Sequence, residues 1–131
     1  MKKIIIVLMA LSLTVVSCGT ESSGETQSME EVMNKQQRVS KETFKSFLAE
    51  NKEVQLIDVR TPDEFHAGTI DGAKNMDFYG PDFHAQLESL DKEKPVMIFC
   101  KSGGRSGQTL DMMKEMGFTT VLELEGGYSN W

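Results

Sequence analysis

Residues 95–106 read PVMIFCKSGGRS, and this stretch decides the fold of the chain. The apolar residues 96–99 predict a buried strand, which ends at Cys100 and so places a thiol at its carboxyl end. Gly103 and Gly104 relax the steric limits on the backbone dihedral angles. The loop after the strand is therefore expected to curl its amide N–H groups around the sulfur.

A helix is expected directly after this loop, because apolar residues recur at helical spacing and a glycine follows where a left-handed cap would fall. These residues are Leu110, Met113, Met116 and Gly117. The loop amides, the positive end of the helix dipole and the cations Lys101 and Arg105 all favour the thiolate of Cys100 over the thiol. A cysteine that only filled a core would give no reason for these glycines and cations. The pattern indicates a nucleophilic cysteine.

The first residues of the chain have a different composition from the rest. Lys2 and Lys3 precede an apolar run at 4–13, and VVSC follows at 15–18. This arrangement predicts a secretory signal peptide over residues 1–17, and its apolar run is short for a membrane span. The VVSC ending resembles the lipobox of bacterial lipoproteins, which implies cleavage before Cys18 and attachment of a lipid to it. The alternatives are a plain signal peptide with an unmodified Cys18 and an uncleaved anchor.

We therefore expect a signal peptide at 1–17, a lipidated cysteine with a flexible tether at 18–37, and one domain at 38–131. Ser, Thr, Glu, Gln and Gly dominate the tether, which is typical of chain without a core. The lipid would hold the protein in the bacterial cell envelope, facing the periplasm or at the cell surface. The formal net charge of −6 argues against a nucleic-acid partner, because such binding rests on neutralising phosphates.

Helix and strand signals alternate along the expected domain. Helices are predicted to begin after Ser40, after Thr61 (with Pro62 and Glu64 completing a capping box), after Gly80-Pro81 and after the cysteine loop. Strands are predicted at 54–59, 96–99 and 119–124, with extended chain at 75–78. The alternation predicts an α/β fold with a small, mostly parallel sheet and helices on both faces.

In such a sheet, functional sites form beyond the carboxyl ends of the strands. Asp58, Arg60 and Cys100 would all lie at that edge. The histidines, His66 and His84, are too far apart in the pattern to suggest a metal site. Neither is needed as a base, because amides and cations already stabilise the thiolate. We therefore expect no metal and no cofactor.

The chain resembles a single-domain rhodanese, with the thiosulfate sulfurtransferase-like fold, over residues 38–131. The residues that carry the resemblance are Leu56–Arg60, Glu64-Phe65, Gly68, Ile70, Gly72-Ala73, Asn75, Cys100–Ser106, Gly126-Gly127 and Trp131. Thr69 and Asp71 depart from the family pattern, in which a histidine and a proline stand at these positions. These two positions are expected to shape a loop rather than to perform chemistry.

The resemblance implies a sulfurtransferase that forms a persulfide on Cys100. Sulfur would come from thiosulfate or a similar anion and pass to cyanide or a thiol, with a protein thiol as a further acceptor. The substrate-binding residues would be Lys101, Ser102, Gly103, Gly104, Arg105 and Ser106, supported by Asp58, Arg60 and Glu64. Arg105 would either attract the anionic donor or bond to a carboxylate such as Glu64 or Asp58, which leaves Lys101 as the freer cation.

Three other functions fit parts of the pattern. Phosphatases and arsenate reductases of this fold have one more residue between the cysteine and the arginine, and the shorter loop here suits sulfur better than a tetrahedral oxyanion. The presence of Cys100 and of both loop cations argues against an inert binding module, whereas a sulfur carrier whose acceptor is a protein stays open. A redox sensor would normally have a resolving cysteine near Cys100. Sulfur transfer is the function that the sequence favours.

Overall fold

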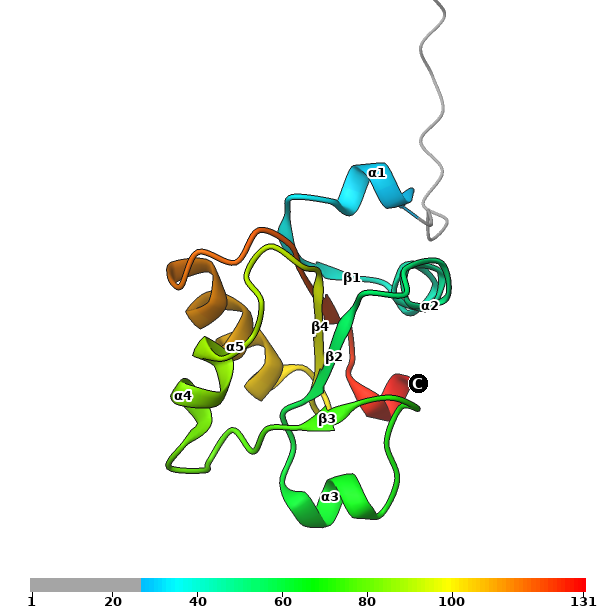
Figure 1. Ribbon diagram of the computed structural model, residues 1–131. Coiled ribbons are helices and arrows are strands. Elements are labelled where there is room, and N and C mark those ends of the chain that lie inside the picture. Colours follow the sequence, from blue (N-terminus) through cyan, green and yellow to red (C-terminus); the bar gives the residue numbers. More distant parts are fainter. Residues whose placement is uncertain (1–26) are drawn as a thin grey trace, which may run out of the picture.

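The computed structural model describes residues 27–131, and its centre is a five-stranded sheet (Figure 1). The strands are β1 (Gln36–Val39), β2 (Gln55–Asp58), β3 (Lys74–Asn75), β4 (Val96–Phe99) and β5 (Val121–Leu124). Their order is β1-β5-β4-β2-β3, and each pairing is parallel. The α/β class predicted from the sequence is confirmed.

Helices cover both faces of the sheet, as predicted. They are α1 (Met29–Val32), α2 (Lys41–Glu50), α3 (Pro62–His66), α4 (Phe83–Glu88), α5 (Gly104–Glu115) and a final 3-10 turn, η1 (Tyr128–Asn130). Figure 1 shows α4 and α5 on one side of the sheet and α2 on the other. Two apolar clusters result, one under α4 and α5 and one under α1 and α2.

Strand β4 lies in the middle of the sheet and supplies side chains to both clusters. Val96 and Ile98 point toward α5, whereas Met97 and Phe99 point toward α2. All four are fully buried, which explains why the strand reads as a continuous apolar run rather than as an alternating one. Cys100 follows on the α5 side, so the position of the thiol is set by a fully buried strand in the middle of the sheet.

Two of the four predicted helix starts, those of α2 and α3, are confirmed by their side-chain caps. The hydroxyl of Ser40 accepts a hydrogen bond from the amide of Thr43. At α3 the capping box is complete, because Thr61 and Glu64 exchange side-chain to backbone hydrogen bonds and Pro62 is the first helical residue. Both signals involve residues close together in the chain, so they are readable without knowledge of the tertiary structure.

The predicted tether at 18–37 extends too far along the chain, because the folded unit already includes α1 and β1. Val32 is fully buried, and β1 pairs with β5 at the edge of the sheet. The side-chain amide of Gln36 donates to the carbonyl oxygens of Phe118 and Thr119. This edge strand uses polar side chains, so it lacks the apolar pattern from which strands are recognised.

The predicted signal peptide at 1–17 and the predicted lipid attachment at Cys18 lie outside the residues that the structure describes. Within residues 27–131, none of the helices combines the length and the apolar character needed to cross a membrane.

Gly127 brings the end of the chain against the carboxyl end of β4. The amides that follow it bond to the cysteine loop, Tyr128 N–H to the oxygen of Cys100 at 2.8 Å and Ser129 N–H to that of Lys101 at 2.9 Å. Gly127 has φ +62°, and a Cβ atom here would lie 2.6 Å from the carbonyl oxygen of Cys100. The close approach of two backbone segments therefore requires glycine.

We expect Gly127→Ala to destabilise the full chain by at least about 3 kcal/mol, because it adds a backbone clash to an unfavourable φ. Gly72→Ala is the matched control, because Gly72 also has a positive φ (+84°) but its Cβ would meet nothing within 4 Å. It should cost only about 1 kcal/mol. Urea denaturation measures both, and equal losses would contradict the importance of the close approach.

Candidate functional site

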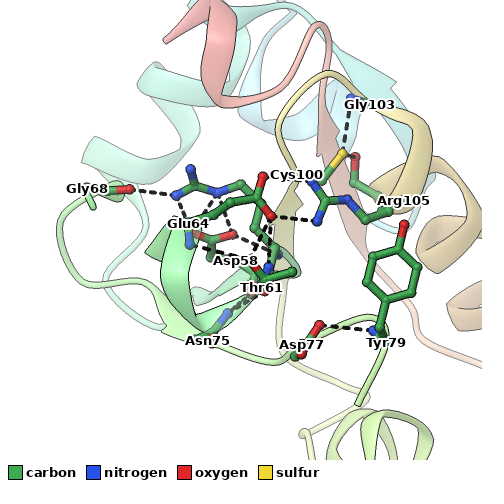
Figure 2. Close-up of polar contacts among 12 residues, drawn as sticks. Asp58, Thr61, Glu64, Gly68, Asn75, Asp77, Tyr79, Cys100, Gly103 and Arg105 are labelled. Carbon is green, nitrogen blue, oxygen red and sulfur yellow. Dashed lines mark hydrogen bonds and ion pairs between the residues drawn. The ribbon is translucent and has the colours of Figure 1, made fainter. Parts of the chain in front are cut away.

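Cys100 lies directly after β4 and before α5, and the residue is only 1 % exposed. Gly103 has φ +106° and turns its amide N–H back onto the sulfur, with 3.1 Å between the nitrogen and Sγ (Figure 2). The hydroxyl of Ser106, in the first turn of α5, lies 3.3 Å from Sγ. The loop therefore encloses the sulfur with hydrogen-bond donors, as the two glycines led us to expect.

These donors stabilise the thiolate. Burial raises the pKa of the Cys100 thiol, but hydrogen bonds from the Ser106 hydroxyl and from the amides of Ser106, Gly103 and Ser102 lower it, and the net pKa is below the ordinary value of a cysteine. Thiolate stabilisation by the loop is the mechanism that the sequence predicted. The groups that supply it are amides and a hydroxyl rather than a cation in contact with the sulfur.

Arg105 forms a bidentate ion pair with Glu64. Its Nη1 lies 2.8 Å from one carboxylate oxygen of Glu64 and its Nη2 lies 2.9 Å from the other (Figure 2). This interaction lowers the pKa of Glu64 to about 2, against an ordinary value of 4.5. Of the two carboxylates that the sequence offered to Arg105, Glu64 is the partner, and the pair joins α3 to α5 beside the cysteine loop.

Lys101 follows Cys100 in the loop and is exposed to solvent. Tyr79 lies next to Arg105 (Figure 2). The ring of Tyr79 is 5.8 Å from the guanidinium carbon of Arg105, and the residue is 70 % exposed. An exposed cation of the cysteine loop and an exposed aromatic ring beside Arg105 therefore belong to the surroundings of the site. Tyr79 was not predicted as a site residue, because it belongs to a turn without a recognisable motif.

Asp58 and Arg60 form a buried network that supports the neighbouring loop. Arg60 pairs with Asp58, with 2.6 Å between Nη2 and Oδ2, and also donates to the carbonyl oxygen of Gly68. The hydroxyl of Thr69 donates to Asp58 at 2.8 Å. Thr69 therefore helps to hold this loop. This position was expected from the sequence to shape a loop rather than to perform chemistry. The bonds of Arg60 go to Asp58 and to the loop rather than to Cys100.

Two charged residues behind the cysteine loop were missed in the sequence. Glu123 of β5 is fully buried and accepts a hydrogen bond from the Ser106 hydroxyl at 2.6 Å. Its other oxygen pairs with Nε of Arg38, from β1. A glutamate at an inward position of the predicted strand 119–124 was a usable signal, because buried charges are rare without a specific partner.

The site thus gathers residues from several elements at the carboxyl edge of the sheet. Those within the cysteine loop and its helix are Cys100, Lys101, Ser102, Gly103, Gly104, Arg105 and Ser106, and Glu64 reaches them from α3. Between residues 27 and 131, no three His, Cys, Asp or Glu side chains are grouped so that they could hold a metal ion.

Comparisons with known proteins show which family the chain resembles. The rhodanese-like domain family matches residues 40–131. The chain is 31 % identical to a sulfurtransferase of Allochromatium vinosum, over 71 % of this chain and 85 % of that protein. It is 32 % identical to the thiosulfate sulfurtransferase GlpE of Shewanella oneidensis, over 64 % of this chain and 81 % of that protein. The solved structure of the human single-domain sulfurtransferase TSTD1 superposes with a TM-score of 0.59 at 29 % identity, over 72 % of this chain and 93 % of that one.

The Glu64–Arg105 pair makes the stability of the fold depend on pH. Because the pKa of Glu64 is about 2 in the folded chain and 4.5 for a free side chain, its contribution is fully present above about pH 4.5 and is lost as the pH falls through about 2. We expect Glu64→Gln to destabilise the protein by about 1 kcal/mol at pH 7, a value that allows for partial solvent screening. Glutamine keeps the capping-box acceptor, so the loss reports the charge.

Urea denaturation between pH 7 and pH 2 measures this difference, which should shrink as the pH falls. Glu53→Gln is the control, because the Glu53 side chain is exposed and forms an ion pair with the exposed Lys94, at 3.5 Å. It should change the stability little at any pH. A destabilisation by Glu64→Gln that stays constant down to pH 2 would contradict the assignment to the ion pair.

Proposed function

The chain belongs to the rhodanese-like domain family, and from this premise we propose that it is a sulfurtransferase that moves sulfane sulfur through a persulfide on Cys100. The observation that carries the proposal is the enclosure of Sγ by the amide of Gly103 at 3.1 Å and the hydroxyl of Ser106 at 3.3 Å. Such donors favour the thiolate, which is the nucleophilic form of cysteine.

In the first half-reaction, the thiolate of Cys100 attacks the outer sulfur of thiosulfate or of a similar donor. A sulfur–sulfur bond forms to Cys100, and the bond between the two sulfur atoms of the donor breaks. Its electron pair leaves with sulfite. The product is a persulfide that carries one negative charge on its terminal sulfur, so atoms and charge balance. The loop amides are suited to hold that charge.

In the second half-reaction, an acceptor removes the terminal sulfur. A thiolate or cyanide attacks this atom, the new bond forms to the acceptor, and the electron pair of the persulfide bond returns to Cys100 as a thiolate. The enzyme is then ready for another cycle. A thiol on another protein is an acceptor of the same chemistry.

The cations around the loop have different tasks in this proposal. Arg105 is occupied by Glu64, so its charge is largely compensated and its task is to hold α3 against the start of α5. Lys101 is exposed and is the cation that we expect an anionic donor to meet first. The engagement of Arg105 and the short loop between Cys100 and Arg105 also make a phosphatase a poorer candidate than a sulfurtransferase.

The proposal includes a location. A lipid on Cys18 would hold the domain in the bacterial cell envelope, facing the periplasm or at the cell surface. This part rests on the amino-terminal sequence alone. Globomycin, which inhibits the lipoprotein signal peptidase, tests it: in a bacterial host it should cause the uncleaved precursor of this protein to accumulate.

Intact mass spectrometry of the protein after incubation with thiosulfate tests the reaction. We expect a gain of about 32 Da, the mass of one sulfur atom, which is lost again when cyanide is added. Cys100→Ala should show no gain, because it lacks the nucleophile.

No gain with thiosulfate or with other sulfane donors, in a folded protein whose Cys100 still reacts with an alkylating reagent, would overturn the proposal. A non-catalytic binding module would then be the better interpretation. The alkylation control separates a missing activity from a blocked thiol.

A further inference from the structure

Glu123 is a buried carboxylate in the sheet, behind the cysteine loop. It is fully buried, and its neighbours along β5, Leu122 and Leu124, belong to the apolar core. A charge in such a place is costly unless both carboxylate oxygens are engaged. Here one oxygen accepts the Ser106 hydroxyl at 2.6 Å and the other pairs with Arg38. This arrangement calls for an explanation beyond stability, because an apolar residue would pack there at lower cost.

Glu123 and Arg38 together bond to two of the residues that contact the reactive sulfur. Glu123 binds the hydroxyl of Ser106, and Arg38 donates from Nη2 to the carbonyl oxygen of Gly103 at 3.2 Å. Ser106 and Gly103 in turn place their hydroxyl and amide near Sγ of Cys100. The Glu123–Arg38 ion pair therefore reaches the sulfur through one intermediate residue on each route, Ser106 from Glu123 and Gly103 from Arg38.

The Ser106 hydroxyl has two acceptors within reach but only one proton to donate. Its oxygen lies 2.6 Å from Oε1 of Glu123 and 3.3 Å from Sγ of Cys100. When the proton points to Glu123, the sulfur faces only the lone pairs of the hydroxyl oxygen, an environment that suits a thiol. When the proton points to the sulfur, it stabilises a thiolate.

We propose that Glu123, held by Arg38, is a positioning residue that competes with the Cys100 sulfur for the proton of Ser106 and so controls how readily that sulfur carries a negative charge. The inference rests on the proposed function for its use in sulfur transfer. Its test does not, because the ionisation of Cys100 is measurable without any sulfur donor.

This competition suits both halves of the proposed cycle. While Cys100 attacks the donor, a hydroxyl turned toward Glu123 leaves the thiolate less stabilised and thus more nucleophilic. In the persulfide, the inner sulfur carries no charge and needs no donor, so the proton of Ser106 stays with Glu123. When the acceptor removes the outer sulfur, Cys100 becomes a thiolate again and the hydroxyl can turn back to it. The Ser106 proton changes its acceptor without leaving its oxygen.

Other charges also act on this site and must be accounted for. The guanidinium groups of Arg38, from β1, and Arg105, from α5, are close enough to interact electrostatically with Cys100. Glu125, just after β5, acts on Arg38, and Glu64 and Tyr79 act on Arg105. Lys101 is exposed beside the sulfur-bearing residue. Among the charged groups of residues 27–131 that act on this site, Glu123 is the one that accepts a hydrogen bond from the Ser106 hydroxyl.

The test is the pH dependence of Cys100 alkylation by iodoacetamide in the full chain, read by mass spectrometry of the Cys100 peptide. In Glu123→Gln, the amide oxygen can accept from Arg38 while the amide N–H donates to Ser106, which frees the hydroxyl proton for the sulfur. The negative charge also disappears. We expect the pH midpoint of Cys100 alkylation to fall. At pH values below that midpoint, the alkylation rate should rise by roughly threefold to tenfold.

Arg38→Gln should have the opposite effect and raise the midpoint. It leaves the charge of Glu123 uncompensated and removes a cation that favours the thiolate. The Arg38 side chain is half exposed, so this variant is expected to fold. A merely structural ion pair would give shifts of the same direction in both variants, because either substitution would loosen the same loop. Opposite shifts exclude a merely structural pair, and a Ser106→Ala background separates the competition for the hydroxyl proton from the effect of charge alone.

Two further variants sharpen the test. Glu125→Gln is the matched control, because it removes an exposed negative charge two residues away that does not bond to Ser106, and it should leave the midpoint unchanged. Ser106→Ala removes the shared proton, so Glu123→Gln on that background should shift the midpoint much less than it does alone. An equal shift on both backgrounds would show that only the charge matters and would overturn the role of the hydroxyl.

An unchanged or raised midpoint in Glu123→Gln, or shifts of the same direction in Glu123→Gln and Arg38→Gln, would overturn the inference. If Glu123→Gln does not fold, Arg38→Gln on the wild-type and Ser106→Ala backgrounds decides, because an equal shift on both backgrounds would show an effect of charge alone and overturn the inference. The two proposals fail separately. A missing persulfide with the expected opposite shifts would overturn sulfur transfer alone, and persulfide formation without those shifts would overturn the control by Glu123 alone.

Discussion

The hydrogen bond from the amide of Gly103 to the sulfur of Cys100 is the interaction on which the rest of the structure depends. A thiolate that is almost entirely buried needs donors close by, and a loop can aim them at the sulfur only if its backbone adopts a left-handed conformation at Gly103. Strand β4 delivers the sulfur to this point, and α5 starts directly after the turn. The central strand, the loop and the helix therefore act as one unit.

Around this unit, the fold places ion pairs where the strands end. Glu64 and Arg105 join α3 to α5, Asp58 and Arg60 hold the loop after α3, and Glu123 with Arg38 lies behind the cysteine loop. The Glu64–Arg105 and Glu123–Arg38 pairs join elements far apart in the chain, and Asp58 with Arg60 links the end of β2 to the loop after α3 through bonds to Gly68 and Thr69. Together they keep the loop in place without a direct contact of their charged groups to the sulfur, which leaves the loop amides and the Ser106 hydroxyl as the groups that bond to it directly.

The parts of the fold that were predicted correctly depend on residues close together in the chain. The capping box at Thr61, the cap at Ser40 and the apolar run of β4 are local patterns, and all three elements form as expected. Strand β1 was missed because its contacts are long-range. Gln36 bonds to residues more than eighty positions away, and nothing in its own neighbourhood marks it as a strand.

The sequence by itself determined the α/β class, the position of Cys100 at the end of a buried strand and the loop that surrounds it, because the glycines and the helix start act on the neighbouring backbone. Only the tertiary structure decided which charges meet. Arg105 forms an ion pair with Glu64, 41 residues earlier in the chain, and Glu123 pairs with Arg38, 85 residues earlier. These pairs depend on the strand order β1-β5-β4 and on the position of α3. Charge pairing requires proximity in space, and spacing along the chain does not specify it.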